Sequence, residues 1–252
     1  MIKYEDHKRN HVIIPGREEV LDKFLKSSYK GMSHKTKNGH SSNSEDAITW
    51  SCFDIISQLS EAKKAIALDE LIEHSFCDKD MAKKEFSFSD EKNIQIEVGK
   101  TYKGLIIKEQ TELDACIETS TKVIFIEAKL YSSISLSNGD SESYDQIAKK
   151  LRVGRDYSAK ENKEFFFIFL DIAPRNKIYS FSDEKKSMEN AKKLSPKKWK
   201  SVWWFNRYKR TPHAMKEILD NIASLQTLNS VAENMGWLTW TDLFKITMRS
   251  LV

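Results

Sequence analysis

Two adjacent segments, Thr111–Glu118 and Val123–Lys129, constrain the fold more than any other part of the chain. The second is a run of β-branched and aromatic residues that ends in Glu127-Ala128-Lys129, a pattern typical of a buried strand. The first is half apolar, and four polar residues, Thr119 to Lys122, separate the two. The pattern predicts two antiparallel strands joined by a short turn.

The register between these strands decides where their charged side chains lie. A turn of two or four residues places Asp114 opposite Glu127. The same register places Glu112 opposite Lys129, so that all four side chains share one face of the sheet. A turn of three residues pairs Asp114 with Ile126 instead and sends the carboxylates to opposite faces.

Three carboxylates and one lysine on a single patch of sheet are unfavourable unless an ion or a partner compensates them. Oxygen ligands alone, with no Cys or His at metal spacing nearby, favour Mg²⁺ or Mn²⁺ over Zn²⁺. The pattern therefore predicts a divalent-cation site. For Glu112 the alternative is an ordinary strand-edge carboxylate paired with Lys129 or Lys122.

The rest of the chain predicts an α/β fold, with a mixed central sheet of four to five strands flanked by helices. Glu164–Leu170 is the most apolar run and predicts a central strand covered on both faces. Ser44 is placed as the N-cap of a helix that runs to Ser60. The other predicted elements are helices at Glu18–Leu25, Ala65–His74, Tyr144–Tyr157, Glu189–Leu194, Pro212–Leu225 and Trp237–Phe244, a helix or turn at Asp78–Phe86, a hairpin or first strand from Phe86–Phe88 and Ile94–Val98, and an edge strand at Lys177–Phe181.

We divide the chain into three parts that form a single globular unit. Residues 1–43 are a basic N-terminal extension, whose Gly31–Asn43 segment has linker composition and is expected to be mobile. Residues 44–185 form the core. Residues 186–252 form a helical, basic and aromatic C-terminal extension packed on that core.

Composition narrows the classes of protein. The chain has 252 residues, 40% hydrophobic and 31% charged, which suffices for one α/β domain with appendages. It has no apolar window long enough for a transmembrane helix and no signal-peptide pattern at its start, so we expect a cytoplasmic protein without a membrane partner. The three cysteines are widely spaced and predict reduced core residues. Serine-hydrolase, zinc-protease and Gly-rich phosphate-binding motifs are missing.

Basic residues are concentrated late in the chain, although the net charge is only +4. Between Lys192 and Arg210 there are eight Lys or Arg, no acidic residue and several aromatic residues, a composition that suits phosphate contacts and base stacking. The alternative is that Trp199, Trp203 and Phe205 are core residues. The expected nucleic-acid contacts are Lys197, Lys198, Lys200, Arg207, Lys209 and Arg210, together with Lys149, Lys150, Arg152 and Arg155 on the predicted 144–157 helix.

The order of these elements resembles the PD-(D/E)xK nuclease superfamily, to which many restriction endonucleases, resolvases and repair nucleases belong. The matching residues are Asp114, Glu127 and Lys129, and the resemblance covers residues 44–171. Glu45, Glu112 and Gln146 match accessory positions, whereas Leu113 stands where the motif has Pro. The resemblance implies a restriction-endonuclease-like core.

The resemblance also implies metal-assisted hydrolysis of a phosphodiester. Asp114 and Glu127, helped by the Ala128 carbonyl, would hold Mg²⁺, for which Mn²⁺ would substitute. Lys129 would orient or deprotonate the attacking water or stabilise the developing charge. Glu45 would bind a second metal or anchor Lys129, or serve only the helix dipole. Gln146 would position water or phosphate, or lie on the helix surface.

We therefore expect a Mg²⁺-dependent endonuclease that acts on DNA as a homodimer, in restriction or foreign-DNA defence. The alternatives are a non-catalytic nucleic-acid-binding or regulatory protein of the same fold, and a nuclease that acts on RNA or branched DNA.

Overall fold

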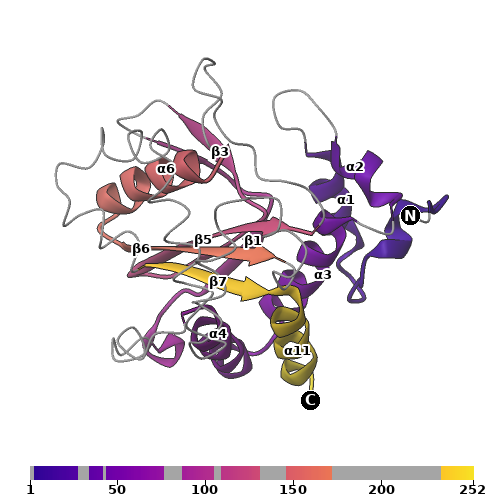
Figure 1. Cartoon of the computed structure of the whole chain (residues 1–252). Helices are drawn as coiled ribbons and strands as arrows, with labels where there is room; N and C mark the ends of the chain where they lie inside the picture. Colours follow the sequence, from indigo (N-terminus) through magenta and orange to yellow (C-terminus); the bar gives the residue numbers. More distant parts are fainter. Residues whose placement is uncertain are drawn as a thin grey trace, which may run out of the picture.

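The computed structural model describes residues 3–27, 34–41, 44–76, 87–104, 109–130, 146–171 and 234–252. The elements predicted at Asp78–Phe86, Lys177–Phe181, Glu189–Leu194 and Pro212–Leu225, and the basic segment Lys192–Arg210, lie outside these ranges. The described part of the chain is built around a mixed sheet with helices on both faces (Figure 1). The predicted α/β class is therefore confirmed.

The sheet has five strands in the order β1-β4-β5-β6-β7. Strands β1, β4 and β5 are antiparallel neighbours, whereas β5, β6 and β7 run parallel. Helix α6 (Gln146–Lys160) lies between β5 and β6 in the chain, where two parallel neighbours require a crossover. The strands are β1 (Gln95–Val98), β4 (Ala115–Glu118), β5 (Lys122–Lys129), β6 (Glu164–Asp171) and β7 (Met235–Thr239).

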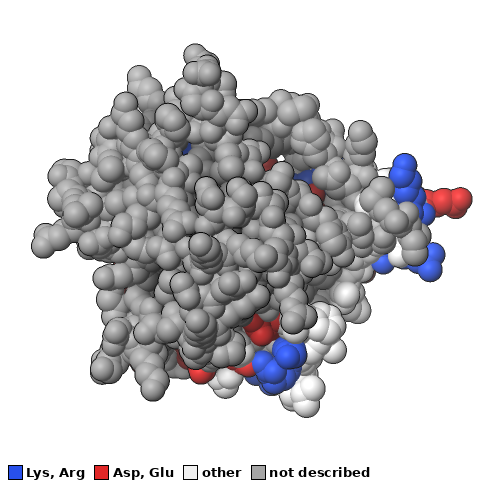
Figure 2. Space-filling model, viewed as in Figure 1, with Lys and Arg blue, Asp and Glu red and all other residues white. Residues whose placement is uncertain are grey.

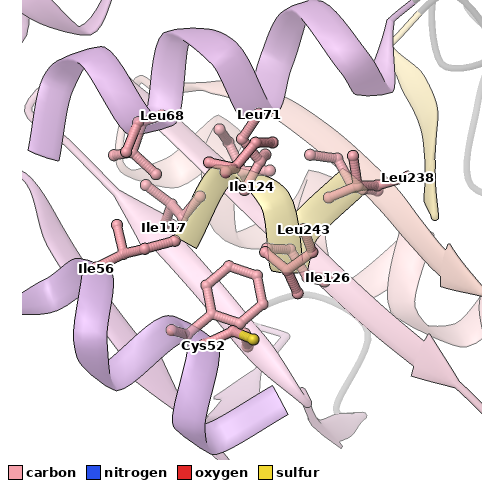
Figure 3. Close-up of a cluster of buried hydrophobic side chains, with 14 of the residues drawn as sticks. Cys52, Ile56, Leu68, Leu71, Ile117, Ile124, Ile126, Leu238 and Leu243 are labelled. Carbon is pink, nitrogen blue, oxygen red and sulfur yellow. The ribbon is translucent and has the colours of Figure 1, made fainter. Parts of the chain in front are cut away.

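The two faces of the sheet are covered by different helices. Helices α3 (Glu45–Ser57), α4 (Glu61–Ser75) and α11 (Trp240–Ser250) cover one face, and α6 covers the other (Figure 1). The first face carries the main apolar core, in which alternate residues of β4 and β5 meet side chains of the helices (Figure 3). Buried aromatic residues of β5 and β6 lie on the opposite face, where the ring of Phe165 is close to Gly154 of α6.

The N-terminal part of the chain packs beside α3 rather than forming a free arm. It consists of η1 (His7–Asn10), α1 (Glu18–Lys26) and α2 (His34–Gly39). Leu21, Phe24 and Leu25 of α1 form a small second core with Trp50 of α3. The expectation of a linker over Gly31–Asn43 is therefore wrong for α2, which is helical.

The predicted strand Thr111–Glu118 is broken in the structure. Its first part, β3 (Gln110–Glu112), pairs with β2 (Thr101–Lys103) in a separate two-stranded sheet, and its second part is β4. The ladder bends where Gly99, at a φ of +72°, donates its N–H to the Asp114 carbonyl at 3.3 Å. A positive φ is accessible to glycine at little cost, so Gly99 permits the bend that divides the strand.

Two shorter predictions also differ from the structure. Residues Met235–Thr239, of which the last three were predicted as helix, form β7, and α11 begins only after Thr239 caps it. Phe88–Asp90 forms the 3₁₀ helix η2, so only Gln95–Val98 becomes a strand in this region. None of the described helices is long and apolar enough to cross a membrane.

Candidate active site

The end of β5 brings the predicted motif residues together. Ala115 pairs with Ile126 and Glu118 with Val123, the register expected for a four-residue turn. One further step along this ladder places Asp114 opposite Glu127 and on the same face of the sheet. Asp114 itself lies at the bend between β3 and β4, just outside the strand. The predicted register of the hairpin is therefore confirmed.

Glu127 lies at the centre of the site and is only 1% exposed. Its Oε1 accepts a hydrogen bond from Gln146 Nε2 at 2.5 Å and lies 2.8 Å from the Lys129 ammonium. Its Oε2 lies 2.6 Å from the Lys150 ammonium but has no aligned hydrogen bond among the described residues. Burial would raise the pKa of Glu127, but the charges of Lys150 and Lys129 outweigh it and lower that pKa.

Asp114 behaves differently, although it shares the same face. Its Oδ2 accepts the backbone N–H of Ala128 at 2.6 Å, which ties the bend to β5. Burial, and then the negative charge of Glu127, raise the pKa of Asp114 well above its ordinary value of 3.8. The two carboxyl groups are therefore coupled, and their interaction shifts the pKa of Asp114 upward while that of Glu127 is lowered.

Lys129, at the end of β5, and Glu45, at the start of α3, complete the group of side chains around Glu127. Burial would lower the pKa of Lys129, but the charges of Glu127 and Asp114 raise it above its usual range, so its ammonium stays protonated. Glu45, in the first turn of α3, accepts the Leu130 N–H at 2.8 Å through Oε2. Its Oε1 lies 3.9 Å from the Lys129 ammonium. These contacts favour the anchoring role of Glu45 over a position beside a second metal.

Glu112 does not join the site in the predicted way. It pairs with Thr101 in the β2-β3 sheet, so the expectation that it faces Lys129 is wrong. Its side chain forms an ion pair with Lys35 of α2, and its carbonyl accepts a hydrogen bond from the Lys150 ammonium. The division of the predicted strand at the bend explains the difference, because β3 leaves the central sheet.

Lys150 is the residue whose role the sequence did not reveal. It was expected to contact phosphate on the surface of α6, but it is only 3% exposed and lies against Glu127. A signal for this position exists in the chain, because Lys150 follows Gln146 by four residues and so shares its helix face. If Gln146 faces the site, Lys150 on the same helix face does so as well.

The other residues of α6 that are expected to contact nucleic acid differ in how exposed they are. Arg152 is buried and held by both carboxylate oxygens of Glu109, at 3.0 and 2.8 Å, contrary to its expected contact with phosphate. Arg155 and Lys149 are both partly exposed. The partial burial of Arg155 lowers the pKa of its guanidinium. On the face shown in Figure 2, the described charged side chains of both signs lie mixed beside α11 and at the N-terminal segment. The expected contacts Lys197, Lys198, Lys200, Arg207, Lys209 and Arg210 lie outside the described residues.

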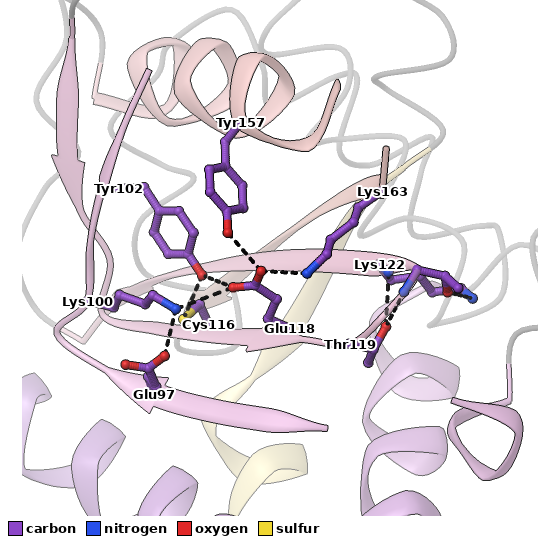
Figure 4. Close-up of polar contacts among 10 residues, drawn as sticks. Glu97, Lys100, Tyr102, Cys116, Glu118, Thr119, Lys122, Tyr157 and Lys163 are labelled. Carbon is purple, nitrogen blue, oxygen red and sulfur yellow. Dashed lines mark hydrogen bonds and ion pairs between the residues drawn. The ribbon is translucent and has the colours of Figure 1, made fainter. Parts of the chain in front are cut away.

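A second buried carboxylate, Glu118, lies at the other end of β4 and joins the elements that carry the site (Figure 4). Its oxygens accept hydrogen bonds from Tyr102 at 2.9 Å, Tyr157 at 2.8 Å and Lys163 at 2.6 Å. Burial alone would raise the pKa of Glu118, but these hydrogen bonds lower it to about 2. Since Tyr157 lies on α6, this network fixes the helix that carries Gln146 and Lys150.

The donor set at the end of β5 fits a divalent cation held by few protein ligands. Asp114 and Glu127 supply hard oxygen atoms, and the buried Oε2 of Glu127 makes no aligned hydrogen bond within the described part of the chain. Among the described residues, no group of three or more Asp, Glu, His or Cys side chains is placed to hold a metal ion. Two carboxylates suffice for Mg²⁺, which keeps several waters and takes phosphate oxygens. The Ala128 carbonyl as a ligand stays a prediction.

Comparisons with known proteins give no relative from which residue roles could be transferred. The interpretation of the site therefore depends on its own geometry and on the short motif that Asp114, Glu127 and Lys129 form. No protein-family model, no characterised protein and no solved structure matches the chain.

Proposed function

We propose that the chain is a Mg²⁺-dependent nuclease that hydrolyses phosphodiester bonds of DNA, with a restriction-endonuclease-like core. The observation that carries the proposal is the meeting of Asp114, Glu127 and Lys129 at the end of β5, around one buried carboxylate. The order of strands supports it, because an antiparallel β1-β4-β5 unit followed by α6 and the parallel β6 agrees with the resemblance. The proposed role in restriction or foreign-DNA defence depends on the resemblance alone.

The side chains divide into three tasks. Asp114 and Glu127 would hold the cation, which when bound polarises a phosphate oxygen and lowers the pKa of a bound water. Lys129 keeps its proton, so its ammonium stabilises negative charge that develops on the phosphate. Of the roles open to Lys129, this one agrees best with its raised pKa.

Two further residues position the first three. Gln146 donates to Glu127 Oε1 and so fixes the plane of that carboxylate. Glu45 receives the Leu130 N–H just after Lys129 and lies beside its ammonium, so α3 is joined to the end of β5. Both are positioning residues, since they reach the site through Glu127 or Lys129.

A cleavage assay tests the proposal directly. Purified protein is incubated with supercoiled plasmid and Mg²⁺ or Mn²⁺, with EDTA as the metal-free control. We expect divalent-dependent conversion of the plasmid, and a loss of at least about a hundredfold in the rate for Asp114→Asn and for Lys129→Met. Single-stranded RNA and branched DNA under the same conditions identify a different preferred substrate.

A matched control separates loss of the site from loss of charge. Glu97→Gln removes a carboxylate from β1, where Glu97 pairs with Lys100 at 2.6 Å, and should cleave at the wild-type rate. Circular dichroism verifies that all variants are folded. Equal cleavage by wild type, Asp114→Asn and Lys129→Met would refute the site, and absence of divalent-dependent cleavage of every nucleic acid would refute the nuclease proposal.

A further inference from the structure

Glu127 is held by two ammonium groups rather than one, and they contact different oxygens. Lys129 and Gln146 both approach Oε1, whereas Lys150 lies on Oε2. Lys129 is the last residue of β5, whereas Lys150 reaches the carboxylate from α6. The two lysines are therefore positioned by different elements.

The contact between Lys150 and Oε2 is close but poorly directed. The two atoms are 2.6 Å apart, yet the oxygen makes no aligned hydrogen bond among the described residues. The aligned hydrogen bond of Lys150 goes instead to the Glu112 carbonyl. Lys150 therefore has a partner that it retains when another cation takes Oε2, and the exchange does not leave its buried ammonium without an acceptor.

The position of Oε2 also matches the needs of a cation. It is a buried carboxylate oxygen on the face that Asp114 shares, and Oε1 is already occupied by Gln146 and Lys129. A divalent cation that binds both carboxylates must therefore use the oxygen on which Lys150 lies.

We propose that Lys150 is an internal counter-cation, which occupies Oε2 of Glu127 in the metal-free protein and competes with the divalent cation for that oxygen. The inference rests on the proposed function, because it takes Asp114 and Glu127 as the metal-binding pair. It gives Lys150 a role in metal affinity, distinct from the stabilisation of reaction charge by Lys129.

Competition makes the expected effect calculable. The apparent affinity for a ligand falls by the fraction of molecules whose site is free to bind it. If Lys150 occupies Oε2 in about nine-tenths of the molecules, the wild-type protein binds the cation about tenfold more weakly than a protein without that ammonium.

The experiment measures Mn²⁺ binding without nucleic acid or turnover. Free Mn²⁺ is followed by electron paramagnetic resonance during titration of the wild-type protein, Lys150→Met and Lys150→Gln. Both substitutions remove the charge, and glutamine also keeps a donor for the Glu112 carbonyl. We expect both to bind Mn²⁺ about tenfold more tightly than wild type.

Two controls separate the possible outcomes. Lys160→Met removes a positive charge from the exposed end of the same helix and should bind Mn²⁺ as wild type does. Glu127→Gln should abolish binding. If both Lys150 variants, shown to be folded by circular dichroism, bind Mn²⁺ as weakly as wild type or more weakly, the inference is overturned and the metal site stands. If neither wild type nor these variants bind Mn²⁺, the metal site itself fails.

Discussion

Replacing Glu118 by glutamine tests how the strands and the helix that carry the site are held together. The Glu118 carboxylate is almost buried and joins the end of β4 to the segment around β2, to α6 and to the start of β6 (Figure 4). Besides Tyr102, Tyr157 and Lys163, Lys100 approaches it at 3.3 Å. Glutamine keeps the shape but offers one oxygen instead of two and carries no charge, so at least one donor loses its acceptor.

The structure sets the size of the effect. The difference between the ordinary pKa of 4.5 and the folded value of about 2 corresponds to at most about 3.4 kcal/mol, at 1.36 kcal/mol per unit. The side chains of Lys100 and Lys163 are 27% and 15% exposed, so solvent screens part of this interaction. We therefore expect Glu118→Gln to lower the free energy of unfolding at neutral pH by about 1–2 kcal/mol.

The sign of the pH dependence follows from the lowered pKa. Between pH 4.5 and about 2 the unfolded chain binds a proton at residue 118 that the folded protein does not, so this contribution is complete above pH 4.5 and is lost as pH falls. Urea unfolding followed by tryptophan fluorescence at several pH values from about 7 down to about 3 measures it. In Glu118→Gln the loss of stability below pH 4.5 should be shallower than in wild type. Parallel curves for the two proteins would refute the reasoning.

Two further substitutions test local features of the fold. Ser44→Ala removes the oxygen that caps α3 by accepting the Ala47 N–H at 3.2 Å, and should lower the free energy of unfolding by about 1 kcal/mol in urea titrations, whereas Ser44→Thr should restore most of it. Gly154→Ala would place a Cβ 2.2 Å from the Phe165 ring, so overpacking of about 1–3 kcal/mol outweighs the gain of about 1 kcal/mol in helix propensity. A lower melting temperature is expected for Gly154→Ala, and a higher one would show that the ring moves aside.

The periodic parts of the chain could be predicted, because their signals are local. The apolar runs of β5 and β6, the cap at Ser44 and the register of the central hairpin all depend on residues close together in sequence. The division of the strand at Asp114 could not be predicted from residues 111–118, because none of them is a glycine or proline that would mark a break. Gly99, which lies between β1 and β2 opposite Asp114, is the sign that the sequence offers.

The ion pairs could not be predicted either, and the reason is different. Helical spacing places Lys150 on the face of Gln146, but it does not say whether that face meets solvent or Glu127. Glu112 and Arg152 show the same difficulty, since their partners Lys35 and Glu109 lie far away in the sequence. The short apolar stretch at 235–239 was ambiguous between strand and helix, and only its parallel pairing with β6 decides it.

The two lysines change what the carboxylate cluster requires. Buried negative charges are unfavourable when they are not compensated, so the carboxylates alone predict a bound cation. In the structure Lys129 and Lys150 supply that compensation from within the chain, at 2.8 and 2.6 Å from the Glu127 carboxylate. The cluster can therefore assemble before any metal binds, which a site built of carboxylates alone could not do. On the proposed function, a divalent cation would displace the Lys150 ammonium from Oε2, while Lys129 keeps its place on Oε1.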